Sequence, residues 1–219
     1  ERTRKQARTS KEGQAELAVL ERLAAALNEG KSARQVDLTQ EESEMLKGLG
    51  LLTGKPIIYA ANVSEEDLAT GNAFVEQVRQ IAAQENAQVV VVSAQVESEL
   101  IDLPQEDRAD FLASLGVEEG GLKSLIRATY ELLGLRTYFT SGEKETRAWT
   151  IHAGMSAPQA AGVIHSDFER GFIRAETVAY NDLVTAGSMN VAKEKGLVRS
   201  EGKEYIVQEG DVMLFRFNV

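Results

Sequence analysis

The sequence predicts an α/β fold followed by an α+β fold, with a helical hairpin in front of both. Two apolar runs, 56–61 and 89–92, are separated by one amphipathic helix, which is the order of a parallel sheet. Further along, the helical runs shorten and pairs of alternating strands appear. Near the start, apolar residues recur every three or four positions, which is the helical period. These changes of pattern divide the chain into residues 1–48, 49–133 and 134–219.

Composition fits a water-soluble protein. At 219 residues, with 43% hydrophobic and 26% charged residues, the chain is long enough for one large or two small domains. It has no run of eighteen apolar residues, so we expect no membrane-spanning helix and no membrane partner. It has no cysteine, which excludes disulfides and thiolate metal sites and fits a cytoplasmic location. Because the chain opens on Glu1 rather than Met, we expect a fragment or a processed chain.

Charge is distributed unevenly along the chain. The net charge is −10, and residues 1–134 hold 14 Lys and Arg against 23 Asp and Glu. The remaining residues hold 10 against 11. Because binding to nucleic-acid phosphates needs clustered cations, we expect no DNA partner and no non-specific binding by the whole chain. A local basic face on the near-neutral C-terminal part remains open.

Residues 1–48 are predicted to form two antiparallel helices. Gly30 is placed to end the first helix in a left-handed conformation. Thr39 and Glu42 form a capping box for the second. The hairpin is either a structural support or an arm that binds a partner. The apolar stripe of the first helix is expected to consist of Leu17, Leu20, Leu23, Ala24 and Leu27.

Residues 49–133 are predicted to alternate strands and helices. The two apolar runs are the strands, and 68–86 is the helix between them. Two shorter helices are expected at 106–115 and 121–133.

Residues 134–219 are predicted to be a compact α+β unit, for which a β-grasp arrangement fits the order of elements best. Two strands flank a glycine-containing hairpin loop at 141–145, and a short helix at 157–164 follows them. Residues 165–171 are expected to be a polar loop. Three further strands are expected, at 171–178, 205–207 and 212–216.

The first strand ends on a motif that can read a nucleobase. Nucleotide-binding P-loop proteins place Asn-Lys-x-Asp at such a strand end, where the Asp accepts two hydrogen bonds from guanine. Here the sequence is Asn62-Val63-Ser64-Glu65, so the base that binds need not be guanine. The second strand ends on Ser93-Ala94, which in such proteins offers backbone N–H groups to the base. Asn at a strand end is also common in simple turns, so the motif gains its weight from the two buried strands.

Several cations in the last segment are candidates for RNA contacts, although a merely solvated face is an equal alternative. His152 and His165 are the only histidines, and neither has a metal-ligand partner at suitable spacing. The candidate cations are Arg147, Arg170, Arg174, Lys193, Lys195 and Arg199.

These residues together resemble the Obg-like ATPases of the YchF type. The resemblance runs through essentially the whole chain and is densest in 51–65, in 89–94 and in the C-terminal run Gly210-Asp-Val-Met-Leu-Phe-Arg-Phe-Asn-Val219. It implies a helical arm, then the last part of a nucleotide-binding domain, then a TGS domain, which is a β-grasp module that tends to meet RNA or ribosomes. The family prefers ATP, so Asn62, Val63 and Glu65 would surround adenine, with Ser93 and Ala94 closing the pocket.

The resemblance also implies what this sequence lacks. No Gly-x-x-x-x-Gly-Lys-Ser/Thr occurs in the 219 residues, and the Mg²⁺-binding elements of the family precede the arm. Because phosphate and metal binding supply most of the catalysis in this class, we expect the chain alone to bind ATP poorly and not to hydrolyse it. Two functions remain open: part of a ribosome-associated, ATP-preferring regulator, or a module for RNA or ribosome binding without hydrolysis.

Overall fold

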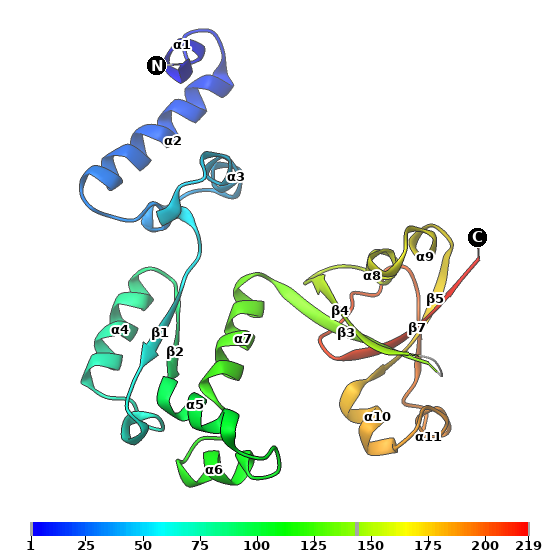
Figure 1. Ribbon diagram of the computed structural model, residues 1–219. Coiled ribbons are helices and arrows are strands. Elements are labelled where there is room, and N and C mark those ends of the chain that lie inside the picture. Colours follow the sequence, from blue (N-terminus) through cyan, green and yellow to red (C-terminus); the bar gives the residue numbers. More distant parts are fainter. Residues whose placement is uncertain (1, 143–144, 219) are drawn as a thin grey trace. The chain divides into compact units, whose positions relative to one another are not determined.

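The computed structural model describes residues 2–142 and 145–218, and the chain divides into two compact units, Glu1–Thr129 and Tyr130–Val219 (Figure 1). Each unit has its own sheet and its own buried clusters. Within the described residues, every helix is too short or too polar to cross a membrane.

The first unit begins with helices α1 (Arg2–Gln6), α2 (Lys11–Asn28) and α3 (Gln40–Leu49). Both predicted helix boundaries are confirmed. Gly30 follows α2 with a φ of 77°, in the left-handed region. The Thr39 hydroxyl accepts a hydrogen bond from the Glu42 N–H at 3.3 Å, and the Glu42 carboxylate accepts one from the Thr39 N–H at 2.9 Å.

The apolar face of α2 is rotated from the expected stripe. Val19 and Leu23 are buried, whereas Ala24 and Leu27 are exposed. The reason is tertiary, because the segment after α2, including a 3-10 turn at Ala33–Gln35, packs on the Val19 side. The predicted helical period is therefore confirmed. The predicted buried face of α2 differs from the observed one.

Strands β1 (Ile58–Asn62) and β2 (Gln88–Val92) pair in parallel, with Ile58 opposite Gln88 and Asn62 opposite Val92. The connecting helix α4 (Ala73–Gln84) begins five residues later than expected. Asn72 sets this start, because its side-chain oxygen accepts hydrogen bonds from the N–H groups of Phe74 and Val75. The preceding residues form a 3-10 turn at Glu65–Asp67 instead.

Three helices complete the first unit: α5 (Ala94–Asp102), α6 (Arg108–Ser114) and α7 (Gly121–Leu132), whose last turn belongs to the second unit. The sequence predicts α6 and α7 but not α5. Gly121 allows α7 to start against β2, since a Cβ there would lie 2.8 Å from a methyl carbon of Val92. The buried cluster consists of Leu68, Val96, Leu100 and Leu112.

The second unit contains a five-stranded sheet in the order β4-β3-β7-β5-β6. Strands β3 and β7 pair in parallel, and the other neighbours are antiparallel. The predicted hairpin of β3 and β4 is confirmed, while residues 143 and 144 of its loop lie outside the described residues. The strands are β3 (Leu135–Ser141), β4 (Thr146–His152), β5 (Phe172–Ala179), β6 (Arg199–Glu201) and β7 (Asp211–Phe217).

Helices lie on both faces of this sheet (Figure 1). Helices α8 (Ala157–Ile164) and α9 (Ser166–Arg170) cover the face that carries Tyr138, Met213 and Phe215. Helices α10 (Tyr180–Ala186) and α11 (Met189–Glu194) cover part of the opposite face, around Val178 and Val212. Because these helices are short, they leave part of the second face open.

Two expectations for this unit are wrong. Residues 205–207 are not a strand, because only Ile206 forms a bridge, with Ser156, and the additional strand is β6. Residues 165–171 are mostly helix α9 rather than a polar loop. Helices of five to seven residues, such as α9 and α10, span fewer than two turns. They are thus too short for an apolar period to be read.

Candidate nucleotide-base and cation sites

The strand ends of the first unit bring four of the predicted base-reading residues together. Asn62 is the last residue of β1, and the next residue, Val63, donates its N–H to the Val92 carbonyl of β2 at 2.9 Å. The side-chain oxygen of Asn62 accepts a hydrogen bond of 2.9 Å from the Ala94 N–H. The Asn62 amide therefore ties the end of β1 to the start of α5.

Ser93 and Ala94 play different parts at this edge. Ser93 is 1% exposed, and its hydroxyl caps α5 by accepting the Val96 N–H at 3.5 Å. Its side chain is thus committed to the helix and faces away from solvent. Ala94 is exposed at the first turn. Because the Ala94 N–H is already bonded to Asn62, the part of this pair that a ligand can reach is the Ala94 methyl group.

Glu65 lies three residues beyond Asn62, at the start of the 3-10 turn. Its side chain is exposed and, within the described chain, forms no hydrogen bond or ion pair. The turn itself is fixed, because the Asp67 carboxylate accepts hydrogen bonds from Ser64 at 3.2 Å and from the Asn72 side-chain amide at 2.8 Å. A hydrogen-bonded turn thus presents an uncommitted carboxylate three residues after Asn62.

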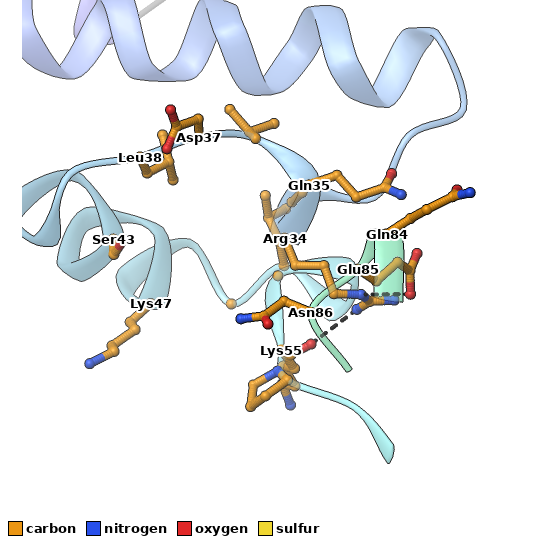
Figure 2. Close-up of a pocket in the computed structure, with 16 residues that line it drawn as sticks. Arg34, Gln35, Asp37, Leu38, Ser43, Lys47, Lys55, Gln84, Glu85 and Asn86 are labelled. Carbon is orange, nitrogen blue, oxygen red and sulfur yellow. Dashed lines mark hydrogen bonds and ion pairs between the residues drawn. The ribbon is translucent and has the colours of Figure 1, made fainter. Parts of the chain in front are cut away.

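A cavity of about 720 Å³ lies at the opposite edge of the two-stranded sheet. Its walls come from the residues before β1, the end of α4 and the segment after α2, and they include Arg34, Lys55 and Glu85 (Figure 2). Ligands of parallel α/β sheets bind at the carboxyl ends of the strands, whereas this cavity lies at the amino ends. We therefore separate it from the base-reading residues.

One carboxylate holds the wall of this cavity together. The Glu85 carboxylate accepts hydrogen bonds from Tyr59 at 2.8 Å, Ser32 at 3.0 Å and Arg34 at 3.3 Å. Arg34 also donates to the carbonyls of Thr53 and Lys55, each at 3.0 Å, and it reaches across the cavity wall in Figure 2. The Tyr59 hydrogen bond, followed by those from Ser32 and Arg34, lowers the pKa of Glu85 although burial opposes it. The network joins the helical segment to the α/β part of the unit.

In the second unit, two of the predicted RNA-contacting cations meet a third that sequence reasoning missed. Arg174 and Lys193 both lie beside Glu176 of β5, at 3.4 and 3.1 Å from its carboxylate, and Arg216 of β7 lies at 3.1 Å. Arg174 also donates a hydrogen bond to Ser200 at 3.2 Å. We call Arg174, Lys193, Arg216 and Glu176 the Glu176 cluster. Alternation along β7 is the signal that indicates Arg216, because Met213 and Phe215 are buried while Leu214 and Arg216 are exposed.

The other four predicted cations lie elsewhere. Arg147 stacks over Trp149 at 4.3 Å on β4, and Arg170 pairs with Asp167 on α9. Arg199 pairs with Glu201 at 2.9 Å on the sheet face opposite to Glu176. Lys195 is exposed at the end of α11. The six cations therefore do not form one face.

The described residues contain no group of three histidines or acids arranged to hold a metal ion. His165 accepts a hydrogen bond from the Asp167 N–H at 3.2 Å through Nδ1, so this ring caps a helix. The residues at the strand ends suit some parts of a nucleotide better than others. The strand ends offer an amide brace and a carboxylate acceptor, and a carboxylate suits the amino group of a base but repels phosphates.

Comparison with known proteins finds similar sequences over nearly the whole chain. Residues 135–218 match the family model YchF-GTPase_C, described as a protein of unknown function (DUF933). The chain is 57% identical over 206 residues to the ribosome-binding ATPase YchF of Bacillus subtilis, covering 93% of this chain and 56% of that protein. This chain is homologous to the C-terminal part of YchF proteins.

Other YchF relatives agree. The protein of the same name from Escherichia coli O157:H7 is 51% identical over 209 residues, which are 95% of this chain and 57% of that protein. The solved structure of the Schizosaccharomyces pombe YchF GTPase matches with a TM-score of 0.77 and 34% identity, over 94% of this chain and 55% of that one. The chain thus spans little more than half the length of the YchF relatives it matches. Their names differ on the nucleotide, since the bacterial proteins are called ATPases and the yeast protein a GTPase.

Proposed function

We propose that this chain supplies the base-reading part of the nucleotide site in a ribosome-associated, ATP-preferring regulator of the cytoplasm. The hydrogen bond from the Ala94 N–H to the Asn62 side-chain oxygen carries this proposal, because it ties together the two strand ends where α/β proteins bind ligands. The family resemblance and the names of the bacterial relatives support it.

The proposed roles follow from the chemistry of adenine. Its 6-amino group is a donor and its N1 is an acceptor. The free Glu65 carboxylate is an acceptor for the amino group, and backbone N–H groups near Ala94 are donors for N1. Val63 stands where the guanine-reading motif has Lys, and its side chain packs against the cluster of Leu68, Val96, Leu100 and Leu112. The relatives are longer than this chain, and we propose that the phosphates and Mg²⁺ of ATP bind to a part of the protein outside this sequence, which would also supply hydrolysis.

An amide-detected NMR titration of the isotope-labelled chain tests the base site. We expect adenosine and ATP to shift the Val63 and Ala94 amide signals at millimolar concentration, and guanosine to shift them less. The Asn62→Ala variant should lose these shifts, whereas Gln95→Ala, at an exposed position one residue beyond Ala94, should keep them. Equal responses to the two bases, or shifts that avoid both strand ends, would show that the motif does not read adenine here.

A second candidate function is RNA or ribosome binding by the helical hairpin and by the second unit as a β-grasp (TGS) module. The Glu176 cluster favours it, because three cations surround one carboxylate in a chain that is otherwise acidic. Sedimentation of the chain with purified ribosomes at increasing salt is the direct test. Binding that weakens with salt supports a phosphate-contacting module, and no co-sedimentation at low salt would contradict it.

A further inference from the structure

A cleft lies beside the Glu176 cluster, and Glu176 is part of its wall. The cleft has a volume of about 300 Å³ and lies between β7 and the helices α10 and α11. Its walls include Leu183, Met189 and Leu214, and Glu176 lines it as well. Small-molecule sites begin at about this volume, so the cleft can hold one planar group of the size of a nucleobase.

Cations and apolar walls meet at one residue. Glu176 lines the cleft and also holds Arg174, Lys193 and Arg216, which come from β5, α11 and β7. The three cations are exposed, whereas the Glu176 side chain is only 13% exposed. Anchoring by Glu176 restricts the cations without covering them, and one acid leaves two positive charges uncompensated within the cluster. Arg guanidinium groups match phosphate oxygens in a two-pronged geometry.

We propose that this cleft and the Glu176 cluster bind one nucleotide of a single-stranded RNA, with the base between Met189 and Leu214 and the phosphate on Arg174 and Arg216. This inference rests on the second candidate function and names the site and the class of RNA. Proteins read unpaired RNA by holding bases against side chains while cations track the backbone.

The base-sized cleft with its apolar walls favours RNA over an acidic protein partner, and Glu176 predicts a base preference. The hydrogen bond from Lys193, followed by that from Arg216, lowers the pKa of Glu176, which keeps the carboxylate ionised at neutral pH. An ionised carboxylate accepts hydrogen bonds from a base amino group. Cytosine and adenine carry such an amino group and uracil does not, so we expect oligo(C) and oligo(A) to bind roughly tenfold more tightly than oligo(U).

Fluorescence anisotropy with the 219-residue chain and labelled pentanucleotides tests the proposal. The Arg174→Gln/Arg216→Gln variant keeps the Lys193–Glu176 pair and should weaken oligo(C) binding about tenfold. It should also flatten the salt dependence by about 0.7 units of slope, because both arginines contact one phosphate and each phosphate contact to a single strand contributes about that much. The charge-matched control Arg79→Gln/Lys123→Gln changes two exposed cations of the first unit, which are not among the candidate RNA contacts, and should bind as the original chain does. Glu176→Gln should reduce the preference for oligo(C) over oligo(U).

Other outcomes overturn the proposal. These are equal loss in the control variant, no preference against oligo(U), polyglutamate competing as well as RNA, or free CMP binding as tightly as the pentanucleotide. If the strand variants lower stability, Lys193→Gln on the exposed side of α11 repeats the test with a smaller loss. Ribosome sedimentation distinguishes a failure of the ribosome-binding function from a failure of this site. Oligonucleotide binding without ribosome binding contradicts only the ribosome function, and ribosome binding that ignores the cluster variants contradicts only this site.

Discussion

Arg34 and Glu85 are 51 residues apart in sequence, yet their side chains form an ion pair of 3.3 Å. Both side chains are largely buried, with exposed fractions of 18% and 12%. Arg34 also donates hydrogen bonds to the backbone carbonyls of Thr53 and Lys55. Glu85 also accepts hydrogen bonds from the hydroxyls of Ser32 and Tyr59. It is therefore the main polar connection between the helical segment and α4.

Glu85→Ala should lower the free energy of unfolding by about 2 kcal/mol at neutral pH, because it leaves Arg34 without its charged partner. The pKa of Glu85 is lowered in the folded state, so its contribution exists above the unfolded pKa and disappears as pH falls through the folded value. The difference between the original chain and the variant should thus shrink below about pH 4. Urea unfolding at several pH values measures it.

Glu29→Gln is the control for this experiment. Glu29 pairs with Lys31 at 2.8 Å, but both side chains are more than 60% exposed, so solvent screens the pair. We expect little change in stability at any pH. A loss as large as that of Glu85→Ala would show that the Arg34–Glu85 network has no special role.

Much of the fold could be predicted from local pattern. The two parallel strands were visible as apolar runs, and the capping box at Thr39 fixed a helix start, because both signals lie within a few residues. The positions of the predicted base-reading residues as neighbours were equally predictable. Once β1 and β2 are parallel, their carboxyl ends must meet, and this places Asn62 beside Ala94.

The remaining features depend on contacts between distant residues. Nothing near Glu85 indicates Arg34, and nothing near Glu176 indicates Arg216, which lies 40 residues away. The rotated face of α2 has the same origin, because a later segment decides which side is covered. The sequence could name candidate cations, but only the strand pairing of β5 and β7 could group them.

Gly121→Ala should destabilise the first unit by about 1–3 kcal/mol, because the new methyl group would meet Val92 at 2.8–2.9 Å. Gly48→Ala is the matched comparison in α3, where the space is open. That change should stabilise the chain by about 0.5–1 kcal/mol through helix propensity. Thermal unfolding of both variants checks the opposite signs, and the same sign for both would contradict the packing of α7 on β2.

Thr177→Val should stabilise the second unit by about 1 kcal/mol. Thr177 is fully buried on β5, and its hydroxyl has no hydrogen-bond partner within the described residues. Valine has nearly the same shape and removes the unsatisfied group. Thr129→Val serves as the control, since that hydroxyl donates to the Leu125 carbonyl at 2.8 Å and its loss should bring no gain. A lower melting temperature for Thr177→Val would indicate that the hydroxyl is satisfied in solution.

Tyr205 should make the second unit sensitive to alkaline pH. Burial, followed by the hydrogen bond to Asp211, raises the pKa of Tyr205 from 10.0 to about 12. A raised folded-state pKa contributes stability below the unfolded value, and this stability is lost as pH rises from about 10 through about 12. The stability difference between the original chain and Tyr205→Phe should therefore shrink over this range. A difference that stays constant across this range would contradict this role of Tyr205.

Introducing the Lys and Asp of the guanine-reading motif should change the base preference of the first unit. In the Val63→Lys/Glu65→Asp variant, the shorter carboxylate at the rigid turn can accept both the N1–H and the 2-amino group of guanine, and the Lys stem covers the base. We expect the NMR response to guanosine to exceed that to adenosine, with a relative change of roughly tenfold, the worth of one hydrogen bond. Glu66→Asp, one position further along the turn, is the control and should leave the preference unchanged. An unaltered preference in the double variant would mean that selectivity does not arise from this motif, even if the Asn62–Ala94 hydrogen bond persists.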